Sequence, residues 1–105
     1  IYDCFTGTVI MMLEDLGFCR KGEGGRFVAD GQMSYGGQIP SNTHGGLLSY
    51  GHCGVGGAMA HLVETQLQMT GRADNRQVRD ASVALLHGDG GVLSSHVSMF
   101  LEQVR

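Results

Sequence analysis

The stretch Asn42-Thr-His-Gly-Gly-Leu-Leu-Ser-Tyr-Gly-His-Cys-Gly-Val-Gly-Gly57 decides how this chain folds, since six of its sixteen residues are glycine. Glycine at this density lets the backbone adopt positive φ and lets other groups approach closely. A flexible linker is one interpretation, but Leu47, Leu48 and Tyr50 lie between the glycines and a helical pattern follows. We therefore expect a tight loop that holds His52 at a helix N-terminus, where backbone N–H groups point at a ligand.

The apolar spacing on either side of this stretch predicts two helices. The first begins near Thr6 or Asp3 as N-cap and ends at Gly17 in the left-handed C′ position. The second runs from about Gly57 to Thr70 and ends at Gly71. The residues that form the two apolar stripes are Val9, Met12, Leu13 and Leu16 in the first, and Ala58, Met59, Leu62, Val63 and Leu67 in the second.

The connections between these helices are polar and rich in glycine. Residues 20–25 and 31–42 read as loops, and residues 27–29 are too few to assign. Long loops that lead into a glycine-rich turn favour a functional role. Residues 72–79 are predicted to form an exposed connection, and His61 is predicted to lie on the polar flank of the second helix.

The last quarter of the chain predicts an antiparallel hairpin. Residues 81–86 are nearly continuously apolar, as in a strand that is buried on both faces. The sequence His87-Gly-Asp-Gly-Gly91 predicts a turn, and Val92–Leu101 a second strand with Val97, Met99 and Leu101 on one face. The chain is therefore expected to be α/β, with helices packed on a sheet that ends in this hairpin.

Composition excludes several classes of function. The net charge of −3 and the scattered basic residues argue against binding to nucleic acid, and no apolar run reaches membrane-spanning length. Three cysteines without a Cys-x-x-Cys pair indicate reduced thiols in a cytoplasmic compartment and no metal site. The chain has 105 residues and enters helical spacing at once from Ile1, so we expect one domain, residues 1–105, cut from a longer chain.

Two residues could carry acid/base chemistry. His52 can take and return a proton near neutral pH, although a hydrogen-bonded turn histidine is the alternative. Cys4 precedes a helix, where the dipole favours a thiolate, although a free cysteine is usually a small buried apolar residue. His44, His61 and His96 lack metal-like spacing, and the glycine pattern lacks the strand and acidic residue of a dinucleotide-binding fold.

Taken together, the motifs resemble the C-terminal part of the thiolase superfamily, in particular the sterol-carrier-protein-type thiolases and thiolase-like lipid-transfer proteins. Tyr2-Asp3-Cys4-Phe5 is similar to the His-Asp-Cys-Phe motif of that branch, and Asn42–Gly57 to its Asn-x-x-Gly-Gly and Gly-His-Pro signature. His87-Gly-Asp-Gly-Gly91 stands in place of the Cys-x-Gly-Gly-Gly turn. The resemblance covers almost the whole chain and implies half of a layered αβα fold with a mixed sheet.

The resemblance also implies roles for individual residues. His52 would activate a nucleophilic cysteine and help bind the thioester oxygen, Cys4 would be the second acid/base, and Tyr2 would help build an oxyanion site. The implied substrate is a coenzyme A thioester, with no covalently bound cofactor and no metal. Residues implied to contact substrate or coenzyme A are Asn42, Gly45, Gly46, Gly90 and Gly91.

The departures from the pattern leave three functions open. Acyl-CoA acyl transfer, meaning Claisen-type bond formation or thiolysis of a 3-oxoacyl-CoA, is the first. Tyr2 in place of histidine is reminiscent of thiolase-fold aldolases that cleave β-hydroxyacyl-CoA, which is the second. A non-catalytic acyl-CoA-binding subunit is the third. The family's nucleophilic cysteine lies in an N-terminal half, so this chain alone is expected to be inactive. That half, a second copy of the chain and an OB-fold accessory protein are the implied partners.

Overall fold

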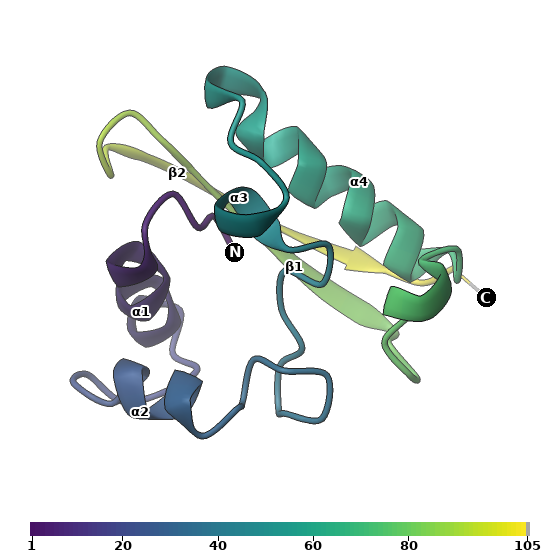
Figure 1. Cartoon of the computed structure of the whole chain (residues 1–105), viewed down its shortest axis with the longest axis horizontal. Helices are drawn as coiled ribbons and strands as arrows, with labels where there is room; N and C mark the ends of the chain where they lie inside the picture. The colour runs from purple at the N-terminus through teal and green to yellow at the C-terminus, as the bar shows by residue number, and fades with distance from the viewer. Residues whose placement is uncertain (105) are drawn as a thin grey trace.

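The computed structural model describes residues 1–104 and has an α/β fold, which confirms the expected class (Figure 1). Its helices and strands are α1 (Thr6–Asp15), α2 (Gly24–Ala29), α3 (Gly46–Ser49), α4 (Gly57–Met69), β1 (Val83–Gly90) and β2 (Ser95–Glu102). Short 3₁₀ turns at Gly54–Gly56 and Asp74–Arg76 flank α4. The layered arrangement with a mixed sheet stays a prediction for a larger protein, because the described residues form one two-stranded sheet.

The hairpin is longer than the sequence predicted. β1 and β2 pair antiparallel from Val83 opposite Glu102 to Gly90 opposite Ser95. His87-Gly-Asp-Gly90 therefore belongs to β1 rather than to a turn. The turn that the sequence predicted over residues 87–91 is thus placed too early in the chain. The chain reverses over residues 91–94 instead, where Gly91 (φ 64°) and Leu93 (φ 54°) take left-handed conformations.

The first helix is capped differently from the prediction, although its end is confirmed. Phe5 is the N-cap residue, its N–H is accepted by Thr8 Oγ1 at 3.3 Å, and Asp3 takes no part. At the other end Gly17 has φ 81° and Phe18 N–H donates to Leu13 O at 2.9 Å, which is a Schellman closure. The stripe of this helix contributes to the core, in which Ile1 and Met12 are buried and Leu13 is fully buried.

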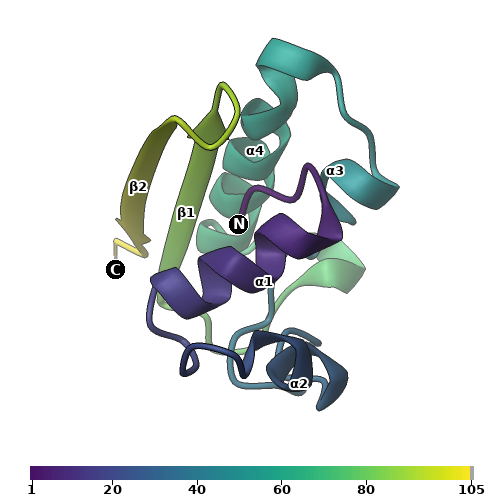
Figure 2. The same cartoon turned by 90° about the vertical axis from the view of Figure 1, so that its left-hand side faces the viewer.

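α4 packs on β1 with a face that the apolar pattern did not predict (Figure 2). Its buried side chains include His61, Glu64 and Gln68, so the prediction that His61 lies on the polar flank is wrong. Met59 and Val63 from the predicted apolar side are 59% and 53% exposed. The polar residues are inside because loop backbone groups and carboxylates pack against this face and need partners.

The structure contradicts two further predictions about burial, and it assigns one segment that the sequence left open. β1 is not buried on both faces, since Val83 is exposed and burial is complete only at residues 86–88. The connection 72–79 is only partly exposed, because Ala73 is fully buried and Gln77 is hydrogen-bonded to α4. Residues 27–29, left unassigned, form the end of α2. Over the described residues, helices long and apolar enough to span a bilayer are absent.

Candidate active site

Asp3 organises the site, although sequence analysis assigned it no role beyond an alternative helix cap. This residue is buried, and its carboxylate accepts hydrogen bonds from the first turn of α3, from Leu47 N–H at 2.9 Å and Leu48 N–H at 3.3 Å. Gly46 makes this approach possible, because a Cβ there would lie 2.2 Å from Asp3 Oδ2. Gly46 also has φ 67°, a conformation that side chains disfavour. Contact with the Asp3 carboxylate thus explains the glycine at position 46.

Asp3 also contacts α4, through a buried hydrogen bond with His61. His61 Nε2 lies 2.9 Å from Asp3 Oδ1, and the two side chains are 4% and 6% exposed. Because a carboxylate oxygen accepts, Nε2 carries the proton of this bond. Residues on either side of Asp3 are therefore fixed relative to both α3 and α4.

Tyr2 and His52 lie side by side at the N-terminal end of α4. Their ring centroids are 6.0 Å apart with an interplanar angle of 86°, while Tyr2 stacks on His61 at 6.1 Å and 25°. Both rings lie against the first residue of α4, since a Cβ on Gly57 would be in ordinary contact with them, 3.4 Å from the Tyr2 hydroxyl and 3.6 Å from His52 Nδ1. The predicted phenol and imidazole thus come together from segments 50 residues apart in sequence.

The orientation of His52 determines which nitrogen is free. Gly54 N–H donates to His52 Nδ1 at 3.1 Å, so in the neutral ring Nδ1 is the acceptor and Nε2 carries the proton. The imidazole is exposed. A neutral His52 therefore presents an N–H donor to any group that enters the site, which suits a carbonyl oxygen that gains negative charge.

Cys4 belongs to the same neighbourhood. Its Sγ lies 3.6 Å from Thr8 Oγ1 at the start of α1, and the side chain is half-buried. Burial raises the pKa of the Tyr2 phenol, and the nearby Cys4 thiol and Asp89 carboxylate raise it further. A phenol with a raised pKa stays protonated at neutral pH and can donate a proton.

The remaining predicted site residues occupy two places. Asn42 bonds the backbone of Ile1 through both ends of its amide, with Nδ2 donating to Ile1 O at 2.8 Å, and Gly45 (φ 105°) precedes α3. Gly90 and Gly91 lie at the tip of the hairpin, at the same end of the molecule as the loop before α4 (Figures 1 and 2). Contact of these residues with substrate stays a prediction.

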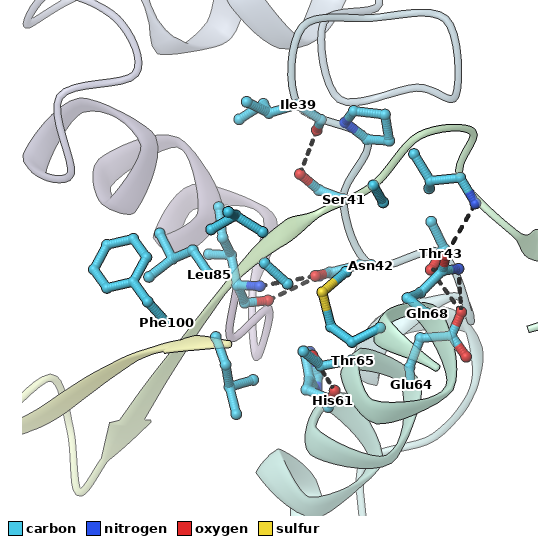
Figure 3. A pocket seen from close by; sticks show the side chains of 18 of the residues that line it. Ile39, Ser41, Asn42, Thr43, His61, Glu64, Thr65, Gln68, Leu85 and Phe100 are labelled. Atoms are coloured by element: carbon cyan, nitrogen blue, oxygen red, sulfur yellow. Dashed lines mark hydrogen bonds between the residues drawn. The ribbon is translucent and has the colours of Figure 1, made fainter. Parts of the chain in front are cut away.

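A cavity of about 510 Å³ lies elsewhere, between α4, β1 and residues 38–43. Figure 3 shows the side chains that line it. Apolar side chains such as Leu85 and Phe100 form one wall, and Glu64 and Gln68 the other. The latter two are hydrogen-bonded to Thr43 and to each other (Figure 3). We place the site at Tyr2 and His52 because the acid/base groups converge there, whereas neither lines this cavity.

Sequence reasoning missed Asp3 and His61 as partners. A signal existed, because Asp3 is flanked by two candidate residues and His61 lies one helical turn after Gly57. What the pattern lacked was the long-range contact across 58 positions. No cluster of three or more His, Cys, Asp or Glu side chains suited to a metal occurs within residues 1–104.

These features define a class of protein, namely α/β domains that bring acid/base side chains from a glycine-rich loop and an N-terminal segment to one end of a helix. The sequence profile described as "Thiolase C-terminal domain-like" matches residues 1–103. The chain belongs to this family.

Similar proteins have related names. The chain is 40% identical to the acetyl-CoA acetyltransferase of Methanothermobacter thermautotrophicus over 92% of this chain and 26% of that protein. It is 40% identical to sterol carrier protein 2 of Bos taurus over 86% of this chain and 17% of that protein. It is 40% identical to the steroid side-chain-cleaving aldolase of Thermomonospora curvata over 71% of this chain and 20% of that protein. The chain therefore spans about a quarter or less of these relatives.

Proposed function

We propose that the protein containing this chain makes or breaks a carbon–carbon bond next to the carbonyl of an acyl-CoA thioester, as a thiolase-like acyltransferase. The supporting observation is the pairing of Tyr2 and His52, whose ring centroids lie 6.0 Å apart beside the N-terminus of α4. Cleavage or formation of such a bond needs a donor for the carbonyl oxygen and an acid/base for the α-carbon.

Each residue has one role in this proposal. His52 Nε2–H donates to the thioester oxygen as negative charge develops there. Cys4 exchanges the proton at the α-carbon, and Tyr2 contributes a second donor. The acyl-accepting thiolate comes from the rest of the protein, so residues 1–105 alone have no acyl transfer activity.

Replacement of His52 tests the proposal in the full-length protein. His52→Ala removes the donor, and acyl transfer measured as 3-oxoacyl-CoA thiolysis should fall by about 100-fold or more. The melting temperature should not change, because the ring is exposed and bonded only to its own loop. Cys4→Ser should also lower turnover, with Cys19→Ser as the matched thiol control. Unchanged turnover in His52→Ala would remove this residue from the mechanism.

A second candidate is retro-aldol cleavage of a β-hydroxyacyl-CoA, and Tyr2 is the observation that favours it. Its ring stacks on the imidazole of His61 and lies 6.0 Å from that of His52, so its hydroxyl can serve as a donor to a bound substrate. The Thermomonospora curvata relative is named an aldolase. Tyr2→Phe keeps the ring and removes the proton, so aldol cleavage should fall by a larger factor than thiolysis, for which Tyr2 is the second donor beside His52. Full aldol cleavage by this variant would count against the candidate.

The third candidate is a non-catalytic acyl-CoA-binding partner, which an upstream sequence without a nucleophile motif would favour. In all three cases we propose a cytoplasmic protein whose partners are an N-terminal half, a second copy and an OB-fold protein. Exposed apolar side chains support assembly, among them Val55, Met59, Val63, Val83, Val97 and Phe100. The isolated chain should therefore self-associate, and a monodisperse monomer in light scattering would contradict this.

A further inference from the structure

One buried acidic side chain on the hairpin has no role in the proposal above. Asp89 lies near the end of β1, and its side chain is 3% exposed. Its Oδ1 atom is buried, and no group within residues 1–104 donates a hydrogen bond to it. A buried carboxylate oxygen that is left unpaired destabilises the folded state, so a donor that comes within reach will bind it.

The residue directly opposite Asp89 on β2 is His96. Its Nδ1 lies 3.8 Å from Asp89 Oδ1, which is close enough for an ion pair but too long for a hydrogen bond. His96 Nε2 lies 3.3 Å from the carbonyl oxygen of Leu93. Because a carbonyl only accepts, Nε2 carries the proton of the neutral ring. Nδ1 then presents a lone pair to the carboxylate, and the two acceptors do not bind each other.

Protonation of His96 changes this contact. The second proton goes to Nδ1, so the charged ring can donate to Asp89 while Nε2 keeps its bond to Leu93. A hydrogen bond between an imidazolium and a carboxylate is charge-assisted and therefore stronger than a neutral one. The ring would then connect the turn to the buried end of β1.

The turn over residues 91–94 has few other contacts to hold it. Leu93 has φ 54°, a conformation that residues with a side chain rarely adopt. Ser94 N–H donates to Gly90 O at 3.3 Å, which is a long bond. Gly90 and Gly91, for which contact with substrate is predicted, belong to the same segment. A bond added through His96 should therefore have a measurable effect on this turn.

The other ionisable groups near the pair favour a proton on His96. The ring of His87 stacks on that of His96, with centroids 5.4 Å apart and an angle of 15°. Burial lowers the pKa of His87, and His96 and the amino group of Ile1 lower it further, so His87 stays neutral longer as pH falls. The Tyr2 phenol, which Asp89 also influences, has a raised pKa and is neutral at these pH values.

We propose that the hairpin tip is a pH-sensitive element, in which protonated His96 forms an ion pair with Asp89 and fixes the turn over residues 91–94 to β1. Histidine side chains ordinarily change charge between about pH 5 and 8. The ion pair therefore forms as pH falls through this range and is lost as pH rises. The inference does not depend on which reaction the protein catalyses.

Hydrogen–deuterium exchange of the full-length protein tests the inference. Protection of backbone amides is compared at pH 7.5 and 5.5, after correction for the intrinsic pH dependence of exchange. Residues 91–95 should be about threefold or more better protected at pH 5.5, as expected for a partly exposed ion pair. Residues 83–86 of β1 serve as the internal reference and should show no such gain, because protonation of buried histidines acts against the fold as pH falls.

Three variants identify the groups responsible. His96→Gln removes the ionisable ring, and Asp89→Asn keeps the shape of the side chain but removes its charge. Each should reduce the gain in protection to about 1.5-fold or less. His44→Gln is the matched control, because this histidine contacts Tyr50 and His61 rather than the hairpin, and the gain should be kept.

A gain that is confined to residues 91–95, lost in His96→Gln and Asp89→Asn and kept in His44→Gln supports the inference. Absence of the gain in the wild type, an equal gain in residues 83–86, or a gain that persists in His96→Gln overturns it. A gain that persists in Asp89→Asn also overturns it, because His96 would then act through another group. If Asp89→Asn does not fold, the comparison of the wild type with His96→Gln still decides, since the His96 ring is 42% exposed.

Discussion

Two buried polar networks lie on α4, one around His61 in its N-terminal half and one around Glu64 in its C-terminal half. In the first, His61 contacts Asp3, which also binds the first turn of α3. In the second, Glu64 accepts from Thr43 and pairs with Arg76, at 3.0 Å between Arg76 Nη2 and Glu64 Oε2. Both networks connect α4 to segments distant in sequence, but only the first flanks candidate acid/base residues.

The difference shows how a polar helix face can serve both folding and function. Burial raises the pKa of Glu64, but hydrogen bonds from Arg76, Thr43 and Gln68 outweigh it and lower that pKa. Gln68 completes the network by bonding the backbone of Arg76 at 2.8 Å and accepting from Val78 N–H at 2.9 Å. The C-terminal network thus closes on itself, whereas the N-terminal one orients Tyr2 and Cys4 on either side of Asp3.

The largest effect is expected for Asp3→Ala. It leaves His61 buried without its partner and frees two N–H groups of α3, so the free energy of unfolding should fall by about 3–5 kcal/mol. Urea unfolding of the full-length protein measures this, with the exposed Asp15→Ala as control, which should change stability by about 0.5 kcal/mol or less. Catalytic activity should be lost together with stability. An Asp3→Ala variant that stays stable and active would contradict the role of the N-terminal network in supporting the site.

The next effect is expected for Gly46→Ala. The added Cβ would collide with Asp3 Oδ2 and would require φ 67°, so about 1–3 kcal/mol of stability should be lost. Gly25→Ala in α2 is the matched control, because a Cβ there meets nothing within 4 Å. The same urea titration applies, and equal stabilities of the two variants would refute the close approach of Asp3 to α3.

Glu64→Gln tests the other end of α4. The amide keeps the shape of the side chain but points two donors at donors of Arg76, so stability should fall by about 1–2 kcal/mol. The kcat/KM for acyl-CoA thiolysis should stay within about twofold of the wild-type value. A large kinetic loss without unfolding would show that the two networks are coupled.

The smallest effect is a pH dependence of stability from His44, which is half-buried, and His87, which is buried. Burial and a neighbouring histidine lower the pKa of both His44 and His87 from 6.5 in the folded protein. The unfolded chain then binds protons at higher pH than the folded one, so stability should decrease as pH falls below about 6.5 and level off below the folded pKa values. Thermal melts of wild type and His87→Asn between pH 8 and 5 measure this, and parallel curves would contradict it.

Local signals in the sequence were sufficient to predict most of the helices and strands. They failed where contacts with distant segments determine the structure. The C′ glycines at 17 and 71 both have positive φ, as predicted, because a helix end is a local property. The polar inner face of α4 was missed, since it depends on Asp3 and Thr43 rather than on α4 itself. The hairpin turn was misplaced because the three glycines at 88, 90 and 91 imitate a turn, whereas pairing with β2 keeps residues 87–90 extended.

For the site, the sequence identified the candidate acid/base residues, and the structure showed the buried residues Asp3 and His61 that position them. Tyr2 and His52 were named from motifs, and their proximity could not be predicted because it depends on how two segments 50 residues apart pack at the start of α4.

The most direct test of the account is a double-mutant cycle with Tyr2→Phe and His52→Gln, measured as kcat for acyl-CoA carbon–carbon bond cleavage in the full-length protein. If the phenol and the imidazole act on the same reacting group, the double variant should lose little more activity than the worse single variant. Losses that multiply as independent factors, or full activity in either single variant, would contradict the claim that these two residues form one site.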